Sequence, residues 1–129
     1  MQKKELIAGL LVVLSTVGTV AGIYGIENYR RKKFYTVELI ARAPENGNWY
    51  PQQLKIPYGM KEVKILIRNI ETVTHGFAIP DLGVAVGQIK AGEVKVVRFI
   101  PDKRGTFPFM CTVWCSTRHM QMRGELIIE

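Results

Sequence analysis

The chain has 129 residues, of which 47% are hydrophobic, and this length allows one domain of ordinary size and little else. Its formal net charge of +7 comes from 18 Lys and Arg against 11 Asp and Glu, but six of the basic and two of the acidic residues lie within residues 1–33. The remaining residues therefore carry a net charge of only +3, without a basic stripe or a known motif, which excludes a nucleic-acid-binding domain.

Residues 6–26 form an apolar run of 21 positions without a charged side chain. A helix that rises about 1.5 Å per residue crosses a hydrocarbon core of about 30 Å over such a run. A cleaved signal peptide is the alternative, with a possible small-residue site at Ala21, but its apolar region is usually shorter. A basic block at residues 30–33 follows the run, as at the edge of a membrane span. We therefore predict a single-pass membrane anchor over residues 1–33.

From residue 34 onward the hydrophobic pattern changes from continuous to alternating. Val63, Ile65 and Ile67, for example, alternate with side chains that suit the opposite face of a strand. Short strands are predicted at residues 34–40, 63–68, 73–79, 84–89, 94–100, 106–110 and 125–128. Gly, Pro, Asn and Asp separate these strands, and no soluble helix is predicted. The pattern indicates one all-β domain over residues 34–129, a small Greek-key β-sandwich.

Four candidate metal ligands lie within twelve residues: Cys111, Cys115, His119 and Met122. Thiolate and thioether prefer Cu(I), imidazole binds copper or zinc, and methionine is an uncommon zinc ligand. The set therefore points to copper. The alternative for the two cysteines is a disulfide, which an oxidising compartment permits if their Cα atoms lie within about 7 Å.

His75 is one of only two histidines in the chain. A lone histidine on a strand is more often a core or surface residue than a ligand, but here it is the one spare imidazole beside a set of metal ligands. Met110 and Met120 also flank the ligand loop, and either can be an ordinary packing residue.

The spacing Cys-x3-Cys-x3-His-x2-Met, from Cys111 to Met122, resembles the CuA loop of cytochrome oxidase subunit II. Residues 75–83 and 124–128 are also similar to that family, and the resemblance covers about residues 50–129. It implies a cupredoxin-like fold and a binuclear CuA centre of two copper ions bridged by both thiolates. It further implies the remaining ligands: His75 and Met122 on one copper, His119 and the backbone carbonyl of Val113 on the other.

The single N-terminal span resembles the short subunit II of B-type haem-copper oxidases. The resemblance implies an electron-transfer subunit that accepts electrons from cytochrome c or a similar donor and passes them to haem in subunit I. Such a complex is a proton-translocating oxidoreductase of the inner membrane, and this chain alone is not a catalyst. The donor and the oxidising compartment place the copper domain on the periplasmic side. The positive-inside rule points the other way, because two lysines precede the span and four basic residues follow it.

Other functions fit parts of the same pattern. A CuA subunit of a nitric oxide or nitrous oxide reductase uses the same chemistry, and the stretch at residues 119–122 resembles the latter. A membrane-anchored copper-delivery protein fits less well, because such proteins place the histidine far downstream of the cysteines, whereas His75 lies upstream. A blue single-copper protein would leave one of the two thiols unexplained.

Several residues receive secondary hypotheses. Val113 stands where larger oxidases have a glutamate that helps to bind magnesium, so no such magnesium ligand is expected from this chain. Trp49, Tyr50 and Trp114 are candidates for electron uptake, although aromatic residues in loops are as often packing residues. The resemblance places Glu5 near the mouth of a proton pathway, while the alternative is a favourable contact with the positive end of the helix dipole.

Overall fold

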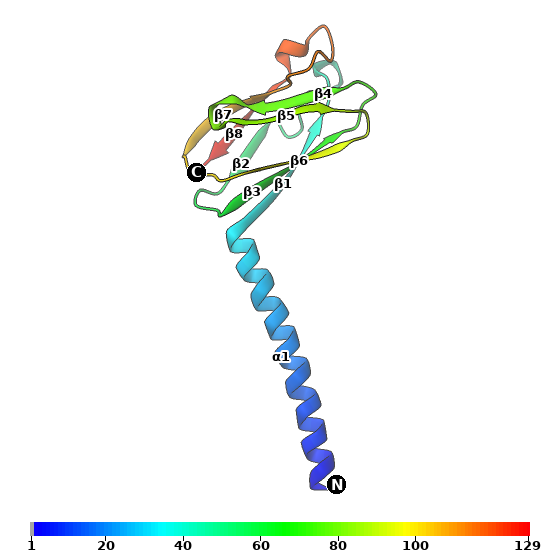
Figure 1. Cartoon of the computed structure of the whole chain (residues 1–129), viewed down its shortest axis with the longest axis vertical. Helices are drawn as coiled ribbons and strands as arrows, with labels where there is room; N and C mark the ends of the chain where they lie inside the picture. The colour runs from blue at the N-terminus through cyan, green and yellow to red at the C-terminus, as the bar shows by residue number, and fades with distance from the viewer. Residues whose placement is uncertain (1) are drawn as a thin grey trace. The chain divides into compact units, whose positions relative to one another are not determined.

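The computed structural model describes residues 2–129, and the chain divides after Lys33 into two compact units, which are described separately. The first unit is helix α1 (Lys3–Lys33), whose side chains are exposed throughout. Its length and composition are sufficient to cross a membrane (Figure 1). Glu5 lies in its first turn and four basic residues lie in its last turn, an arrangement that the helix dipole favours.

The second unit, Phe34–Glu129, is a sandwich of two sheets (Figure 1). Its strands are β1 (Phe34–Ala41), β2 (Gln53–Ile56), β3 (Glu62–Asn69), β4 (His75–Ile79), β5 (Val84–Ile89), β6 (Val94–Phe99), β7 (Gly105–Met110) and β8 (Arg123–Ile128). One sheet has the order β1-β3-β6 and the other β2-β8-β7-β4-β5, so the chain crosses repeatedly between them. This β-sandwich preceded by one apolar helix confirms the fold class predicted from the sequence.

The alternation of apolar residues explains how β3 contributes to the core. Val63, Ile65 and Ile67 are fully buried, while the residues between them face outward. Strand β2 was not predicted, because its four residues are too short for alternation to be recognised. It forms because it pairs in parallel with β8, which puts Leu54 opposite Leu126 across a long sequence separation.

Three buried aromatic residues pack together under the loop that follows β7. The ring centroids of Trp49 lie 5.6 Å from Phe77 and 5.7 Å from Phe109, both in edge-to-face geometry. Phe77 is two residues after His75, and Phe109 is two residues before Cys111. The aromatic core therefore fixes the two strands that carry these candidate ligands.

Candidate metal centre

Two neighbouring strands bring the candidate ligands to one end of the sandwich. Strands β4 and β7 are antiparallel, with Ala78 opposite Met110. The chain that leaves β7 at Cys111 therefore passes the first residue of β4, which is His75. The loop of residues 111–122, orange in Figure 1, then returns to β8, and it closes where the Cys111 amide donates to the Met122 carbonyl at 3.1 Å.

The side-chain atoms of the candidate ligands converge on the two sulfurs. The Sγ atoms of Cys111 and Cys115 lie 3.8 Å apart, and both cysteines are free. Nδ1 of His75 lies 3.8 Å from Cys111 Sγ, and Nδ1 of His119 lies 3.6 Å from Cys115 Sγ. The Sδ atom of Met122 lies 3.6 Å from Cys115 Sγ. The structure thus brings together all five side chains that the sequence proposes as ligands.

The backbone carbonyl of Val113 also faces this cluster, with its oxygen 3.2 Å from Cys111 Sγ. Among the three methionines near the loop, Met122 is fully buried and contacts Cys115, whereas Met120 is 67% exposed. Met110 is half-buried at the end of β7.

The spacing of these atoms fits a soft metal ion. Metal–thiolate bonds are about 2.3 Å long, so two sulfurs 3.8 Å apart subtend a near-tetrahedral angle at a shared ion. The nitrogen–sulfur distances of 3.6 and 3.8 Å likewise fit metal–imidazole bonds of about 2.0 Å. Two thiols, two imidazoles and a thioether form a donor set that favours copper over zinc, magnesium or calcium.

Hydrogen bonds favour ionisation of one thiol, whereas burial and a neighbouring charge oppose ionisation of the other. Burial opposes ionisation of Cys111, but its hydrogen bonds with His75 and with the Gly76 amide outweigh this effect and lower the pKa of the thiol. Burial, together with the neighbouring charge of Cys111, raises the pKa of Cys115. Two adjacent thiolates in this pocket would repel each other, and a bound cation would offset that repulsion.

The structure adds one residue to the site that sequence reasoning missed. Glu71 Oε2 lies 2.7 Å from Nε2 of His75, on the side of the ring away from Cys111. Burial disfavours the charged carboxylate, but hydrogen bonds from Asn46, Ala43 and His75 outweigh it and lower the pKa of Glu71. Burial likewise opposes protonation of His75, but its hydrogen bonds to Cys111 and Glu71 raise its pKa. Nothing in the sequence marks Glu71 as a partner of His75, because a spacing of four residues does not predict a side-chain contact in a turn.

The three aromatic candidates for electron uptake occupy different environments. Trp49 is 1% exposed and donates its Nε1–H to the carbonyl of Met122 at 3.2 Å. Its ring therefore offers no surface to a donor, and we reassign Trp49 to the core. Tyr50 is 60% exposed, and Trp114 is 70% exposed, with its ring centroid 5.8 Å from that of His119. Trp114 thus extends from a candidate ligand to the surface.

Glu5 lies in the helical unit rather than in the domain that holds the metal site. Its Oε2 accepts a hydrogen bond from the backbone amide of Gln2 at 3.1 Å, within the first turn of α1. The side chain is otherwise exposed along the helix.

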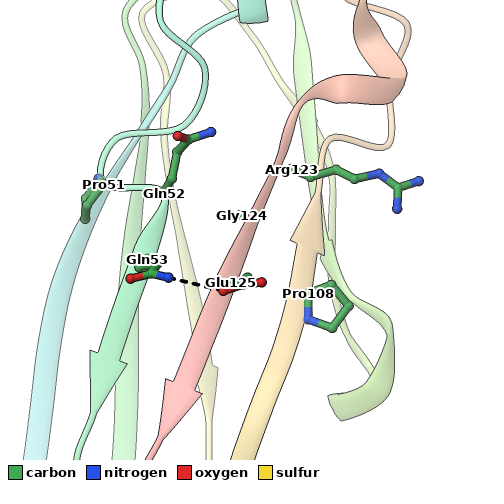
Figure 2. A pocket seen from close by; sticks show the side chains of 7 residues that line it. All are labelled: Pro51, Gln52, Gln53, Pro108, Arg123, Gly124 and Glu125. Atoms are coloured by element: carbon green, nitrogen blue, oxygen red, sulfur yellow. Dashed lines mark hydrogen bonds between the residues drawn. The ribbon is translucent and has the colours of Figure 1, made fainter.

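An open pocket on the five-stranded sheet is separate from the metal site, and Figure 2 shows its lining over β2, β8 and β7. It is lined by Pro51, Gln52, Gln53, Pro108, Arg123, Gly124 and Glu125. Gln53 donates to the Glu125 carboxylate at 3.3 Å across the two strands. The lining lacks the soft ligands of the cysteine cluster.

Comparison with known families agrees with this architecture. The model of the cupredoxin-like domain family matches residues 28–128, which is more than half of the chain. The chain therefore belongs to the cupredoxin-like domain family, as the resemblance implied.

The relatives with a similar sequence include nitrous-oxide reductases and a cytochrome c oxidase subunit. The nitrous-oxide reductase of Ralstonia nicotianae is 35% identical over 103 residues, covering 78% of this chain and 15% of the relative. The alternative cytochrome c oxidase subunit 2 of Bradyrhizobium diazoefficiens is 34% identical over 85 residues, covering 66% of this chain and 28% of the relative. The chain thus spans less than a third of the length of either relative.

Solved structures share the fold at low sequence identity. A chain of a heme-copper terminal oxidase dimer is 21% identical with a TM-score of 0.63, and the alignment covers 98% of both chains. The periplasmic domain of cytochrome oxidase subunit II from Bradyrhizobium japonicum is 17% identical with a TM-score of 0.57, covering 73% of this chain and 83% of that domain.

Proposed function

We propose that this chain is the CuA-bearing electron-transfer subunit of a membrane-bound haem-copper terminal oxidase. The observation that carries the proposal is the pair of free thiols at 3.8 Å, flanked by the imidazoles of His75 and His119 and by the Met122 thioether. A site with two bridging thiolates suits two copper ions better than one.

The residues of the chain have separate roles in this proposal. Cys111 and Cys115 would bridge the two ions, with His75 and Met122 completing one and His119 and the Val113 carbonyl the other. When bound, the copper pair would supply a carrier for one electron. Because His75 lies on the buried strand β4 and the other ligands lie on a loop closed by a backbone hydrogen bond, their positions would change little between the two charge states of the site, which favours rapid transfer.

The exposed side of the site gives a route for electrons. His75 is fully buried, whereas His119 is only half-buried and lies beside the exposed ring of Trp114. We therefore propose that a donor such as cytochrome c docks over Trp114 and His119, with Tyr50 as a further exposed candidate. Electrons would then pass to a haem of a partner subunit I.

The membrane arrangement is part of the same proposal. Helix α1 would anchor the chain as a single span, with the copper domain on the periplasmic side, where the electron donor would be. The basic residues on both sides of the span do not favour this orientation. Packing of the helix against other subunits of the complex would have to offset that preference.

A second candidate function is supported by the nitrous-oxide reductase relatives, which match this chain at up to 35% identity. Two observations favour the oxidase. One is the shared helix-plus-domain fold over 98% of a terminal-oxidase chain. The other is the candidate membrane span, which suits a subunit of a membrane-bound complex.

The copper site is tested by loading the full chain, in detergent, with copper. We expect two coppers per chain and an electron paramagnetic resonance spectrum with hyperfine coupling to two equivalent nuclei. Cys111→Ser and Cys115→Ser should each abolish that coupling. One copper per chain with a four-line spectrum would support a single-copper site instead.

The partner is tested by isolating the complex from native membranes and identifying its other chains. A haem-bearing subunit I and reduction of oxygen are expected. Reduction of nitrous oxide or nitric oxide by the same complex would establish the second candidate.

A further inference from the structure

The carboxylate of Glu71 lies between His75, a candidate copper ligand, and the loop of residues 43–49, which supplies no ligand. It contacts Nε2 of His75 at 2.7 Å, where the two side chains are 12% and 0% exposed. It also accepts hydrogen bonds from the Ala43 amide at 2.9 Å and from Asn46 Nδ2 at 2.5 Å. The Glu71 amide donates to Asn69 Oδ1 at 2.9 Å. Both the side chain and the backbone of Glu71 are therefore held in place.

The loop that carries Ala43 and Asn46 also contacts the ligand loop, through Asn48 and Trp49. Asn48 Nδ2 donates to the carbonyl of Gln121 at 2.9 Å, and Trp49 Nε1 donates to the carbonyl of Met122 at 3.2 Å. The loop of residues 43–49 thus contacts Glu71, the hydrogen-bond partner of His75, at one end and the last turn of the ligand loop at the other.

We propose that Glu71 is a positioning residue for His75, and that residues 43–49 hold His75 in register with the ligand loop. A carboxylate accepts hydrogen bonds but does not donate them, so the proton of a neutral His75 lies on Nε2. Nδ1, on the side of Cys111, then presents its lone pair to the metal. This inference rests on the proposed copper centre.

The charge of Glu71 has a consequence beyond geometry. An anionic acceptor makes the imidazole a better electron donor and stabilises the more positive, oxidised form of the site. A neutral amide at the same position keeps the volume but loses the charge. The NH2 group of that amide must also face at least one of the three groups that donate to the carboxylate, on Ala43, Asn46 and His75, and so loses that hydrogen bond.

The experiment compares Glu71→Gln with wild type in the copper-loaded full chain. Copper affinity should fall about 10- to 100-fold, as is usual when the partner of a metal-bound histidine is changed. The reduction potential should rise, and the copper hyperfine pattern should become less symmetric. Glu45→Gln is the matched control, because Glu45 is an exposed carboxylate of the same loop and should change none of these.

The outcomes separate the possible roles. If Glu71→Gln lowers thermal stability but keeps the wild-type potential and hyperfine pattern, the role is only structural and the inference is wrong. If Glu71→Gln does not fold, nuclear magnetic resonance of the reduced wild-type protein decides. A downfield, slowly exchanging Nε2 proton on His75 is expected, and a rapidly exchanging proton at an ordinary shift would overturn the inference.

The proposed function and this inference can fail separately. A wild-type chain that never shows two equivalent coppers refutes the copper centre itself. A wild-type chain with the copper pair, beside a Glu71→Gln variant with unchanged potential and spectrum, refutes only the role of Glu71.

Discussion

The indole Nε1–H of Trp49 and the backbone amide of Cys111 donate to the same oxygen, the carbonyl of Met122, at 3.2 and 3.1 Å. This carbonyl therefore connects the first and last ligands of the loop to the aromatic core. Trp49 is itself held edge-to-face by Phe77 and Phe109. The ligand loop is thus held in place by its contact with the aromatic core as well as by its own backbone hydrogen bond.

Replacement of Trp49 should affect stability, and replacement of Trp114 should affect electron uptake. Trp49→Phe loses the hydrogen bond to Met122 and leaves a gap in the core, so we expect a loss of about 1–3 kcal/mol in the free energy of unfolding. Trp114→Phe, at an exposed position, should stay within about 0.5 kcal/mol of wild type but slow reduction by a donor. Denaturant titration and stopped-flow reduction measure the two effects. The reverse pattern would return Trp49 to the electron path.

A methyl group at Gly76 should disturb the site, whereas one at Gly87 should not. A Cβ at Gly76 would collide with Thr112 Oγ1 and would lie 2.9 Å from a methyl group of Val113, the residue whose carbonyl faces Cys111. We expect Gly76→Ala to cost about 1–3 kcal/mol and to weaken copper binding. A Cβ at Gly87 meets nothing within 4 Å, so Gly87→Ala is the matched control. Equal copper affinities in the two variants would contradict the close packing seen here.

The thioether ligand can be identified by comparing two methionines. Met122→Leu should shift the reduction potential while both coppers remain bound, because a thioether is a weak ligand that mainly tunes the site. Met120→Leu should leave the potential unchanged, since Met120 is largely exposed. Redox titration with spectroscopic detection measures both. A shift in Met120→Leu alone would show that the ligand is Met120.

The charge around the ligand loop should select an acidic or apolar donor. Arg118 and Arg123 are exposed, and their side chains donate to nearby groups of the loop region, Gln121 Oε1 and the Met120 carbonyl. Arg118→Gln should therefore slow reduction by an acidic donor several-fold and flatten its salt dependence. Lys103→Gln should not, because Lys103 precedes β7 and the ligand loop follows the other end of that strand. Rapid reduction by a strongly basic cytochrome, falling steeply with added salt, would count against this docking charge.

The local pattern of the sequence was sufficient to predict most of the strands of this domain and its ligand loop. Val63, Ile65 and Ile67 show their buried face through alternation, and the ligand loop shows its chemistry because Cys111 and Met122 belong to one continuous segment. The hairpin-like pairing of β7 and β8 needs no information beyond that segment and its flanks.

Features that depend on distant contacts were missed. Strand β2 exists through its pairing with β8, and Glu71 acquires its role only when residues 43–46 fold over it. Trp49 was a candidate for electron uptake because the sequence shows an aromatic residue in a loop but not what covers it. Its burial follows from packing against Phe77 and Phe109, which lie far along the chain.

Glu5 has two possible roles, and they predict different results for Glu5→Gln. In the first turn of α1 its carboxylate accepts the Gln2 amide and meets the positive end of the helix dipole, which is worth about 0.3–1 kcal/mol. The resemblance to oxidase subunit II instead predicts a carboxylate that passes protons toward subunit I. Only the second role needs a group that gains and loses a proton during turnover.

Steady-state oxygen reduction by the intact complex separates these roles. If Glu5 delivers protons, Glu5→Gln should slow turnover several-fold while leaving the rate of copper reduction by the donor unchanged, because electron uptake occurs in the other unit of the chain. Glu27→Gln is the control in the same helix, since Glu27 pairs with Arg31 at 3.1 Å and should leave turnover at the wild-type rate. Wild-type turnover in Glu5→Gln, with the complex assembled, would leave Glu5 only its contact with the helix dipole. Equal slowing in both variants would indicate damage to the anchor rather than loss of a proton path.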